Sequence, residues 1–480
     1  MKILLASSEV HPYSKTGGLA DMIGALGKAF AQAGHQVGIV TPLYRGIVER
    51  FPGIRRLNWR IDLPLATWRE QAELWALEPA RGLTIYFIHK PKYFDRGSLY
   101  HEHGKDYHDN SERFIFFSKC VAHLARYQPW RPELIHVNDW QTGLVPALIL
   151  HQSRKEGWGN PPRTCLTIHN LAYQGIFPRS AYALLNLPGD YFHPEGAEYF
   201  GKLNCLKAGI VYADVLTTVS PRYAREITTE EFGCGLDGVL RKRKLPVQGI
   251  LNGVDYDEWN TSENPHLKHM YSINDLAGKA TNKLALQEEL GLPAKPDVPL
   301  FGTITRLAEQ KGMEIEMGAL EEMLQTDMQF ILLGSGDHGY ERAFQKMAVR
   351  FPDKVAVRTG YDQGLSHRIE AGCDFYIMPS KFEPCGLNQM YSLRYGTIPI
   401  VRTTGGLDDT VVDATEDPLR ATGIKFVEFT STALAKAIRK AKVIYGNPHL
   451  LRHYQRNGMA TDFSWDRTVT AYLKAYRQID

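Results

Sequence analysis

The fold is decided at the start of the chain, where residues 1–41 read MKILLASSEVHPYSKTGGLADMIGALGKAFAQAGHQVGIVT. Residues 3–7 form a short apolar run typical of a buried strand, and residues 37–41 form a second one. Between them, residues 19–33 repeat apolar side chains on one helical face, and Gly34 marks the stop of that helix. A strand, a helix and a strand in this order predict a parallel βαβ unit.

The same alternation continues along the chain, with one interruption. Further strands are predicted at residues 84–88, 134–137, 164–168 and 215–219, and helices at 111–126, 142–153 and 199–212. The alternation of strands and helices stops near residue 250, and residues 255–297 are polar without a clean strand. Strands are predicted again at 300–305, 330–333, 354–358, 375–378 and 398–401, and helices at 313–325 and 340–351. We therefore predict two doubly wound α/β domains, over 1–250 and 251–459, with parallel sheets covered on both faces and a ligand cleft between the domains.

Composition excludes several classes of protein. The 480 residues carry 56 Lys and Arg against 53 Asp and Glu, a formal net charge of +3. A charge this close to balance argues against a protein built to coat nucleic acid or an anionic membrane. The only dense basic block, residues 241–244, is expected to be a solvated turn or helix end. The six cysteines form no Cys-x-x-Cys pair, and no His, Asp and Glu cluster has convincing metal spacing, so we expect no bound metal.

The expected location is the cytoplasm. The apolar run at the N-terminus is too short for a signal peptide, and no run approaches the roughly 20 apolar residues of a membrane span. We therefore expect reduced thiols and no membrane partner.

Two glycine-rich turns follow predicted strands. Residues 334–339 match Gly-x-Gly-x-x-Gly, but the next strand lacks the acidic residue that holds a ribose in nicotinamide dehydrogenases, so we reject that function. Lys15 precedes Gly17 and Gly18 between a strand and a helix, where glycines admit a ligand to the backbone and a helix N-terminus favours an anion. This turn is not a P-loop, and an ordinary tight turn is an equal alternative.

Charged side chains follow two later strands. Arg306 and Lys311 come after one strand, and two cations at a strand end suit a phosphate leaving group. Glu383 follows another strand, ahead of Gly386 and Leu387, whose backbone N–H groups can act as donors at a helix start. The alternatives are solvated surface charge for the cations and an acid that satisfies a helix dipole for Glu383.

Polar pairs follow two strands of the first predicted domain. Asp139 and Asn170 each stand just beyond a strand, beside Asn138 and His169, and Asn252 follows a third apolar run. Such positions face the mouth of a cleft, where small hydroxylated ligands are held. A lone histidine is usually structural, so both a binding and a packing role stay open.

Taken together, these motifs resemble a known family. The chain is similar, nearly end to end, to the bacterial glycogen synthases and plant starch synthases, which are the family 5 retaining glycosyltransferases. The resemblance is carried by Lys15-Thr16-Gly17-Gly18-Leu19-Ala20-Asp21, Tyr107-His108-Asp109-Asn110-Ser111-Glu112-Arg113-Phe114, His136-Val137-Asn138-Asp139-Trp140, Thr167-Ile168-His169-Asn170-Leu171-Ala172-Tyr173-Gln174-Gly175, Leu251-Asn252-Gly253-Val254-Asp255, Thr305-Arg306-Leu307, Gln310-Lys311-Gly312, Pro379-Ser380-Lys381-Phe382-Glu383-Pro384-Cys385-Gly386-Leu387, Arg394-Tyr395-Gly396-Thr397 and Thr404-Gly405-Gly406-Leu407.

The resemblance implies the glycosyltransferase-B (GT-B) architecture, in which two Rossmann-like domains close over a nucleotide sugar. It also implies that residues 460–480 cross back onto the N-terminal domain. The implied reaction is transfer of glucose from ADP-glucose to the non-reducing 4-hydroxyl of an α-1,4-glucan, with retention of configuration. ADP-glucose is a substrate, so no cofactor and no metal are implied.

The resemblance further implies roles for individual residues. The implied catalytic residues are Glu383, Arg306, Lys311, His169 and Asp139, with Arg306 and Lys311 on the leaving diphosphate and His169 near the sugar 6-hydroxyl. The implied donor-binding residues are Lys15, Gly17, Gly18, Asn252, Tyr361, Cys385, Gly386 and Leu387, with Tyr361 packed on the adenine. Asp21, Asn170 and Trp140 are implied on the acceptor side.

Two alternatives stay open. One is a retaining glucosyltransferase that uses UDP-glucose or a small acceptor, and the other is a catalytically silent glucan-binding protein. Related family 4 enzymes carry a second glutamate eight residues after the first, whereas this chain has Tyr391 there, as a family 5 resemblance predicts. The polymer and the oligomeric state stay open as well.

Overall fold

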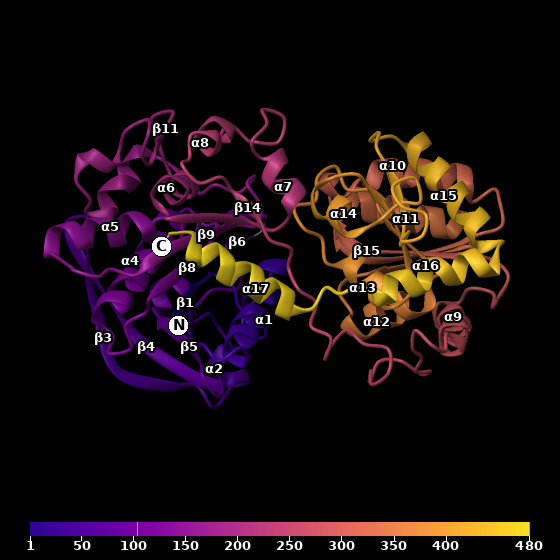
Figure 1. Ribbon diagram of the computed structural model, residues 1–480, viewed down its shortest axis with the longest axis horizontal. Coiled ribbons are helices and arrows are strands. Elements are labelled where there is room, and N and C mark those ends of the chain that lie inside the picture. The colour runs from indigo at the N-terminus through magenta and orange to yellow at the C-terminus, as the bar shows by residue number, and fades with distance from the viewer. Residues whose placement is uncertain (103, 480) are drawn as a thin grey trace. The chain divides into compact units, whose positions relative to one another are not determined.

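The computed structural model describes residues 1–102 and 104–479. The chain forms two compact units (Figure 1). Unit 1 comprises Met1–Gly253 together with the residues from Trp465 onward, and unit 2 comprises Val254–Ser464. The chain therefore crosses between the units twice, after Gly253 and after Ser464. The sequence had placed these crossings at residues 250 and 459.

Unit 1 is built on a sheet in which the described residues supply nine strands, in the order β14-β13-β9-β8-β1-β2-β5-β4-β3. The strands are β1 (Lys2–Ala6), β2 (Gln36–Pro42), β3 (Arg55–Leu65), β4 (Trp68–Ala80), β5 (Leu83–His89), β8 (Leu134–Asn138), β9 (Arg163–Ile168), β13 (Val215–Thr218) and β14 (Gln248–Gly249). The helices are α1 (Gly18–Gln32), α2 (Ile47–Arg50), α3 (Pro91–Phe94), α4 (Asn110–Tyr127), α5 (Val145–Glu156), α6 (Cys205–Tyr212), α7 (Pro221–Glu226), α8 (Asp237–Arg241) and α17 (Trp465–Tyr476). The predicted βαβ unit is confirmed, because β1 and β2 pair in parallel and α1 connects them.

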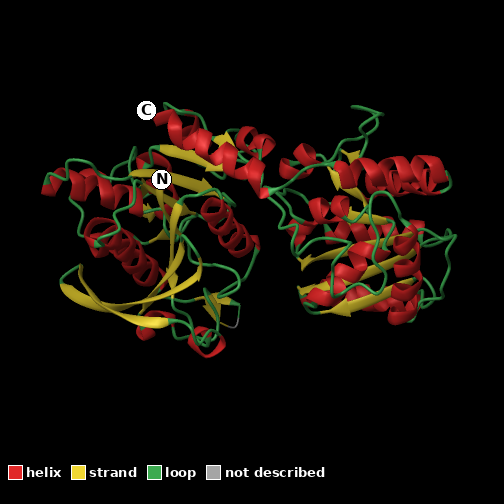
Figure 2. Cartoon of the chain, turned by 60° about the horizontal axis from the view of Figure 1, so that its bottom comes forward, coloured by secondary structure: helices red, strands yellow, loops and turns green. Residues whose placement is uncertain are grey.

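One edge of this sheet departs from the sequence prediction. The long strands β3 and β4 pair antiparallel with each other, and β4 pairs antiparallel with β5 (Figure 2). In β3, the inward side chains Ile61, Leu63 and Leu65 alternate with more exposed ones. Such alternation is typical of a strand with one solvated face, so the sheet is mixed rather than wholly parallel.

The helix predicted over residues 199–212 begins later than expected. Two short strands, β11 (Glu198–Tyr199) and β12 (Lys202–Asn204), form a small sheet with β10 (Ile176–Phe177) before α6 starts at Cys205. The Asn204 side chain accepts a hydrogen bond from the Lys207 N–H, and this N-cap fixes the start of α6. Two further short strands, β6 (His101–Glu102) and β7 (Lys105–Asp106), pair antiparallel.

Helix α17 returns to unit 1 and packs beside α1 (Figure 1). Tyr472 is fully buried and meets the ring of Phe30 edge-on. The hydroxyl of Tyr476 forms a hydrogen bond of 2.8 Å with Nδ1 of His136 on β8. The last helix therefore completes the core of unit 1 and reaches the strand that precedes Asp139.

The basic block at residues 241–244 is not wholly solvated. The guanidinium of Arg243 donates to the carbonyls of Ile210, Ala213 and Asp214, where α6 ends. Burial lowers the pKa of Arg243. The side chain caps a helix C-terminus, which carries carbonyls without intrahelical partners and favours a cation.

We expect Arg243→Met to lower the free energy of unfolding by about 2 kcal/mol, because the carbonyls at the end of α6 lose a charged donor. Urea unfolding measures the effect. Lys242→Met is the matched control, since the Lys242 side chain is 77% exposed and pairs only loosely with Glu195. Equal stability of the two variants would contradict the capping role.

Unit 2 is a smaller sheet with helices on both faces. Its strand order is β17-β16-β15-β18-β19-β20, and each pairing is parallel. The strands are β15 (Leu300–Leu307), β16 (Gln329–Gly336), β17 (Val355–Thr359), β18 (Phe375–Met378), β19 (Ile398–Arg402) and β20 (Ile424–Phe426). The helices are α9 (Ala277–Leu290), α10 (Met313–Met323), α11 (His338–Arg350), α12 (Gln363–Gly372), α13 (Asn388–Arg394), α14 (Gly405–Thr410), α15 (Ser431–Tyr445) and α16 (Pro448–Ala460). Helix α9 lies within the polar stretch, residues 255–297, in which the sequence showed no clean strand.

The core of unit 2 lies on both faces of this sheet. Phe330 and Leu332 of β16 belong to one apolar cluster, which α10, α11 and α15 cover. Ile331 and Leu333 belong to a second cluster, covered by α9 and α12. Neighbouring residues of one strand are thus buried on opposite faces, as the sequence predicted for a doubly wound sheet.

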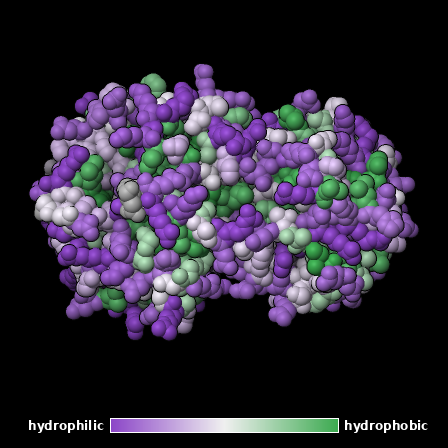
Figure 3. Space-filling model, in the orientation of Figure 1, coloured by the Kyte–Doolittle hydropathy of each residue, from purple (hydrophilic) through white to green (hydrophobic). Residues whose placement is uncertain are grey.

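The face of the molecule shown in Figure 3 is predominantly polar. On this face, hydrophobic residues are scattered among hydrophilic ones (Figure 3). None of the helices in the described part of the chain combines the length and the apolar composition needed to span a membrane.

Candidate active site

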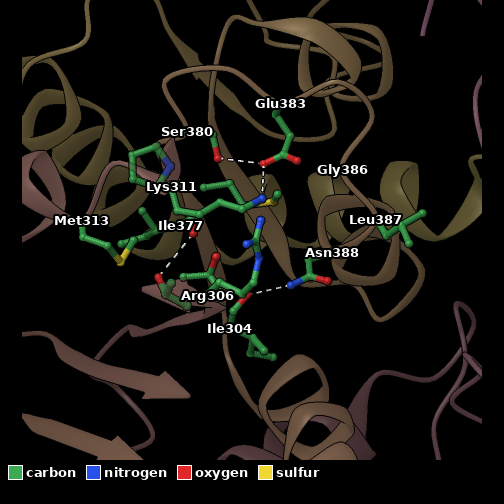
Figure 4. Close-up of a pocket in the computed structure, with 14 residues that line it drawn as sticks. Ile304, Arg306, Lys311, Met313, Ile377, Ser380, Glu383, Gly386, Leu387 and Asn388 are labelled. Atoms are coloured by element: carbon green, nitrogen blue, oxygen red, sulfur yellow. Dashed lines mark hydrogen bonds and ion pairs between the residues drawn. The ribbon is translucent and has the colours of Figure 1, made fainter. Parts of the chain in front are cut away.

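A pocket in unit 2 lies at the C-terminal ends of β15 and β18 (Figure 4). Parallel strands present these ends at the same edge of a sheet, which is where doubly wound proteins bind ligands. Arg306 comes from the end of β15, Lys311 ends the 3₁₀ turn that follows it, and Glu383 lies between β18 and α13. Gly386 and Leu387 line the same pocket. The structure therefore brings together five of the predicted site residues.

Lys311 and Glu383 form an ion pair inside this pocket. Nζ of Lys311 lies 2.6 Å from Oε2 of Glu383, which also accepts the hydroxyl of Ser380 at 2.9 Å. The two side chains of the pair are only 18% and 8% exposed. Shielding from water strengthens such a pair to about 4 kcal/mol at 4 Å with an effective dielectric near 20. Glu383 thus holds the Lys311 ammonium in place and offsets its charge.

Arg306 adds a second cation. Its side chain is exposed, forms no hydrogen bond or ion pair with any residue that the structure describes, and points toward Lys311 (Figure 4). The formal charges of Arg306, Lys311 and Glu383 are +1, +1 and −1, so the pocket keeps a net charge of +1. A ligand with negative charge would relieve the proximity of the two cations.

The loop that carries Glu383 also presents backbone donors. Gly386 adopts φ +71°, in the left-handed region that favours glycine. The side-chain amide of Gln389 donates to the carbonyls of Cys385 and Gly386, at 3.0 and 3.1 Å. Within the described chain no group accepts from the N–H of Gly386 or Leu387. These two N–H groups suit a phosphate oxygen, and buried Cys385 holds the loop.

Tyr361 lies apart from this pocket. It follows β17, is 74% exposed, and lines a second hollow of unit 2 together with Arg358, Leu365 and Glu289. In the sheet, β16 separates β17 from β15. Tyr361 therefore stands on the same edge as Arg306, two strands away.

The predicted glycine turn of unit 1 is tightly fixed. Nζ of Lys15 lies 2.8 Å from a carboxylate oxygen of Asp21 on α1. Helix α1 starts at Gly18, after the extended residue Gly17. Buried Glu9 accepts from the hydroxyl of Thr16 at 2.6 Å, from the N–H of Thr16, and from the N–H of Gly17 at 3.3 Å. The structure therefore brings Lys15, Gly17, Gly18 and Asp21 into one turn.

Asp139 and His169 are joined at the ends of β8 and β9. Oδ1 of Asp139 accepts the backbone N–H of His169 at 2.7 Å, and Asp139 adopts φ +54°, which is uncommon outside glycine. Burial lowers the pKa of His169 to about 3, so its imidazole is neutral at physiological pH. Asn170 directly follows, and its Oδ1 accepts the N–H of Ala172 at 3.0 Å.

We expect the stability contribution of Asp139 to depend on pH. Burial raises its pKa to about 7, although N–H donors from His169 and Asn170 favour the carboxylate. The folded protein keeps a proton that the unfolded chain releases above about pH 4. The contribution to the free energy of unfolding therefore falls between pH 4 and 7, by up to about 4 kcal/mol.

Asp139→Asn removes this titration. Urea unfolding measures the free energy of unfolding of both proteins at each pH. The difference, variant minus wild type, is expected to rise from pH 4.5 to 7 and to level off above pH 7.5. Other titrating groups, such as His136 and His169, are present in both proteins and cancel. A difference that does not change with pH would contradict the assignment.

Two predicted residues of unit 1 differ in their surroundings: Trp140 packs against other side chains, whereas Asn252 keeps a polar atom without a partner among the described residues. Trp140 meets the rings of Phe114 and Phe177 edge-on, and a Cβ at Gly175 would lie 2.4 Å from its indole. Asn252 belongs to unit 1 rather than to the second predicted domain. It is buried, and its Oδ1 has no hydrogen-bond partner among the described residues, so it can still accept from a ligand or a water.

The sequence missed several residues of these sites. Ser380 and Asn388 line the unit 2 pocket, and Asn388 donates to the carbonyl of Ile304 at 2.8 Å. Glu9 fixes the turn at Lys15. Glu9 lies in the loop after β1 and Asn388 at the start of α13, and neither belongs to a pattern that marked it as a site residue. Asn138, which the sequence had placed beside Asp139 at a strand end, contacts His169. In the part of the chain that the structure describes, no group of three or more His, Cys, Asp and Glu is placed to hold a metal ion.

Comparison with known proteins identifies the family. The starch synthase catalytic domain family matches residues 2–242, and the glycosyl transferases group 1 family matches residues 287–459. The glycogen synthase of Anaeromyxobacter dehalogenans strain 2CP-1 is 46% identical and is aligned over 100% of this chain and 99% of its own length. The chain belongs to the glycogen and starch synthase family. A second glycogen synthase, from Anaeromyxobacter sp. strain Fw109-5, is 48% identical over 100% and 99% of the two chains.

One solved structure agrees with this membership of the glycogen and starch synthase family, and a second agrees with the fold. The catalytic domain of starch synthase IV from Arabidopsis thaliana, bound to ADP and acarbose, has a TM-score of 0.90 and 34% identity, and covers 100% of this chain and 99% of its own. Sucrose-phosphate synthase from Thermosynechococcus elongatus has a TM-score of 0.63 at 19% identity, over 100% and 98% of the chains, and shows the fold alone. The resemblance and the two-domain glycosyltransferase fold expected from the sequence are confirmed.

Proposed function

We propose that the protein transfers glucose from ADP-glucose to the non-reducing 4-hydroxyl of an α-1,4-glucan, with retention of configuration. One observation carries the proposal. In a member of the glycogen and starch synthase family, Arg306, Lys311, Glu383 and the free N–H groups of Gly386 and Leu387 line one pocket. The related starch synthase IV is bound to ADP and acarbose, which supports an adenine nucleotide and a glucan as the ligands.

The proposed chemistry in unit 2 is stabilisation of the leaving diphosphate. Cleavage of the glycosidic bond places additional negative charge on that diphosphate, and preorganised cations lower the energy of a transition state in which charge develops. Arg306 and Lys311 supply the cations, and Gly386 and Leu387 supply neutral donors. Tyr361, exposed on the same edge of the sheet, is proposed to pack on the adenine.

For unit 1 we propose the roles that the resemblance implies. Lys15, with Gly17 and Gly18, binds the donor. His169 holds the transferred sugar near its 6-hydroxyl, and Asp139 is a catalytic residue near the reacting centre. The remaining predicted contacts are Asn252 and Cys385 on the donor side, and Asp21, Asn170 and Trp140 on the acceptor side.

Retention of configuration at the anomeric carbon has two possible routes. One passes through a covalent glucosyl-enzyme. In the other, the acceptor hydroxyl attacks the sugar on the face from which the diphosphate leaves. We favour same-face attack, because no dedicated nucleophile stands out: the carboxylate of Glu383 is paired with Lys311 and accepts from Ser380. Isolation of a glucosyl adduct on Glu383 or Asp139 would overturn this route.

The purified protein is tested with glycogen and either ADP-glucose or UDP-glucose, and release of nucleoside diphosphate and growth of the glucan are measured. The proposal predicts release and growth with ADP-glucose and little with UDP-glucose. Preference for UDP-glucose, or for a small acceptor such as glucose, would favour the other transferase. Glucan binding without release from either donor would favour a silent binding protein.

Two further expectations accompany this function. No metal or organic cofactor is proposed, so the rate after treatment with a chelator is expected to equal the untreated rate. A cytoplasmic location is also proposed, and fractionation of the source cells tests it.

A further inference from the structure

The side-chain amide of Asn138 contacts two backbone carbonyls and one ring nitrogen of His169. Nδ2 of Asn138 donates to the carbonyl of Ala6 at 3.1 Å and to that of His136 at 3.4 Å. Its Oδ1 lies 2.9 Å from Nε2 of His169. Asn138 is fully buried at the end of β8, so no bulk water can replace these partners.

The two carbonyls settle which way this amide faces. A carbonyl oxygen can only accept, and the reversed amide would place Oδ1 against the oxygen of Ala6 with no proton between them. The amide nitrogen must therefore face Ala6 and His136, and the amide oxygen must face His169. An oxygen acceptor at 2.9 Å requires a proton on Nε2 of His169.

The state of the other ring nitrogen follows. His169 is neutral, because burial lowers its pKa to about 3. A neutral imidazole with a proton on Nε2 carries a lone pair on Nδ1. Nδ1 forms no hydrogen bond with any residue in the described ranges, and the side chain is only partly buried. Asp139 fixes the backbone of the same residue through the His169 N–H.

We infer that Asn138 is a positioning residue that locks His169 as the Nε2–H tautomer, so that Nδ1 accepts a hydrogen bond donated by a ligand hydroxyl. The ligand part of this inference rests on the proposed function, in which that hydroxyl is the 6-hydroxyl of the transferred glucose. The site then selects a sugar that carries a hydrogen-bond donor next to Nδ1 of His169. A group of the same size that cannot donate a hydrogen bond binds less well.

Nitrogen-15 NMR of the imidazole rings tests the tautomer without reference to activity. The His169 signals, identified by their loss in His169→Gln, are expected to show one protonated nitrogen, Nε2, from pH 6 to 8. A proton on Nδ1, or on both nitrogens, would overturn the inference. In Asn138→Leu the Nε2 proton loses its acceptor and is expected to exchange rapidly with water. Thr142→Val is the matched control, because the Thr142 hydroxyl contacts only the backbone N–H and carbonyl of Asn138 and should leave the His169 signal sharp.

Two donor analogues test the polarity of the ligand contact. ADP-6-deoxyglucose has no group to donate, and ADP-6-deoxy-6-fluoroglucose carries a fluorine that accepts weakly and cannot donate. Both are expected to lose roughly tenfold to a hundredfold in kcat/KM to a similar extent, since each loses one hydrogen bond and leaves Nδ1 unpaired. A fluoro analogue that is clearly better than the deoxy analogue would mean that His169 donates, and would overturn the inference. If ADP-glucose itself is not used, the proposed function fails while the NMR result still decides the tautomer.

Discussion

Lys311→Met is expected to lower turnover by about 10²–10³-fold, with little change in the affinity for glucan. Lys311 and Arg306 are the two cations that line the unit 2 pocket beside the N–H groups of Gly386 and Leu387. A positively charged group that acts on a developing diphosphate charge stabilises the transition state more than the bound substrate. The loss should therefore appear in kcat, measured by nucleoside diphosphate release at saturating glycogen.

A structural role for Lys311 predicts a different outcome, and a double variant separates the two. Removal of Lys311 leaves the Glu383 carboxylate, whose side chain is 8% exposed, with the Ser380 hydroxyl as its donor. This is expected to cost about 2 kcal/mol of folding stability. Lys311→Met with Glu383→Gln removes both charges, so that stability returns. Because Glu383 is itself an implied catalytic residue, turnover of the double variant is compared with that of Glu383→Gln alone and is expected to be well below it. Equal turnover of these two variants would contradict the leaving-group role of Lys311.

Lys381→Met is the matched control for this experiment. Its Nζ pairs with Glu309 at 3.0 Å, but the two side chains are 54% and 74% exposed. Surface ion pairs contribute little, and Lys381 does not line the pocket. Turnover and stability are expected to remain close to those of the wild type.

Sequence patterns predicted most of the parallel strands because those strands are buried on both faces, but the short strands β14 and β20 were missed. A strand such as β16 must be apolar at consecutive positions, and a run of this kind stands out between polar turns. Strands β3 and β4 were missed because one face of each is partly exposed, and Pro64 further weakens the strand pattern in β3. Only the alternation of residues 60–65 marked that edge.

Helix α9 was missed for a different physical reason. Its buried positions include Lys279, Asn282, Lys283 and Gln287, so the inner face carries no continuous apolar stripe. Nζ of Lys283 lies 2.7 Å from Asp374, and Nζ of Lys279 donates to the hydroxyl of Thr397 at 2.6 Å. Polar side chains can occupy a buried helix face when such partners exist, and the partners lie about a hundred residues away in the sequence.

In the unit 2 pocket, too, the sequence does not reveal contacts between residues that are distant along the chain. Placing Arg306, Lys311, Glu383 and His169 just beyond strands required only the knowledge that parallel strands share an edge. The ion pair of Lys311 with Glu383 joins residues that are 72 positions apart. Its existence follows from the neighbouring places of β15 and β18 in the sheet, and no local spacing contains that information.

Gly405→Ala is expected to reduce turnover by at least about 10²-fold and to destabilise unit 2. Gly405 adopts φ +45°, and a Cβ there would lie 2.0 Å from the backbone oxygen of Glu383. Gly291→Ala is the matched control, because Gly291 has φ +78° but nothing within 4 Å of its Cβ position. That control keeps the backbone strain without the collision, and is expected to cost about 1 kcal/mol and to leave turnover unchanged.

The collision at Gly405 cannot be relieved by a small local shift. The N–H of Gly406 donates to the oxygen of Glu383 at 3.1 Å, and a Cβ on Gly406 would itself lie 2.0 Å from the oxygen of Cys385. The two glycines are therefore in backbone contact with the loop that places Glu383 against Lys311. Relief of the clash must move that loop, and a carboxylate displaced by even 1 Å no longer aligns the ammonium. If Gly405→Ala keeps full turnover while melting at the temperature of Gly291→Ala, the position of this loop does not control the reaction.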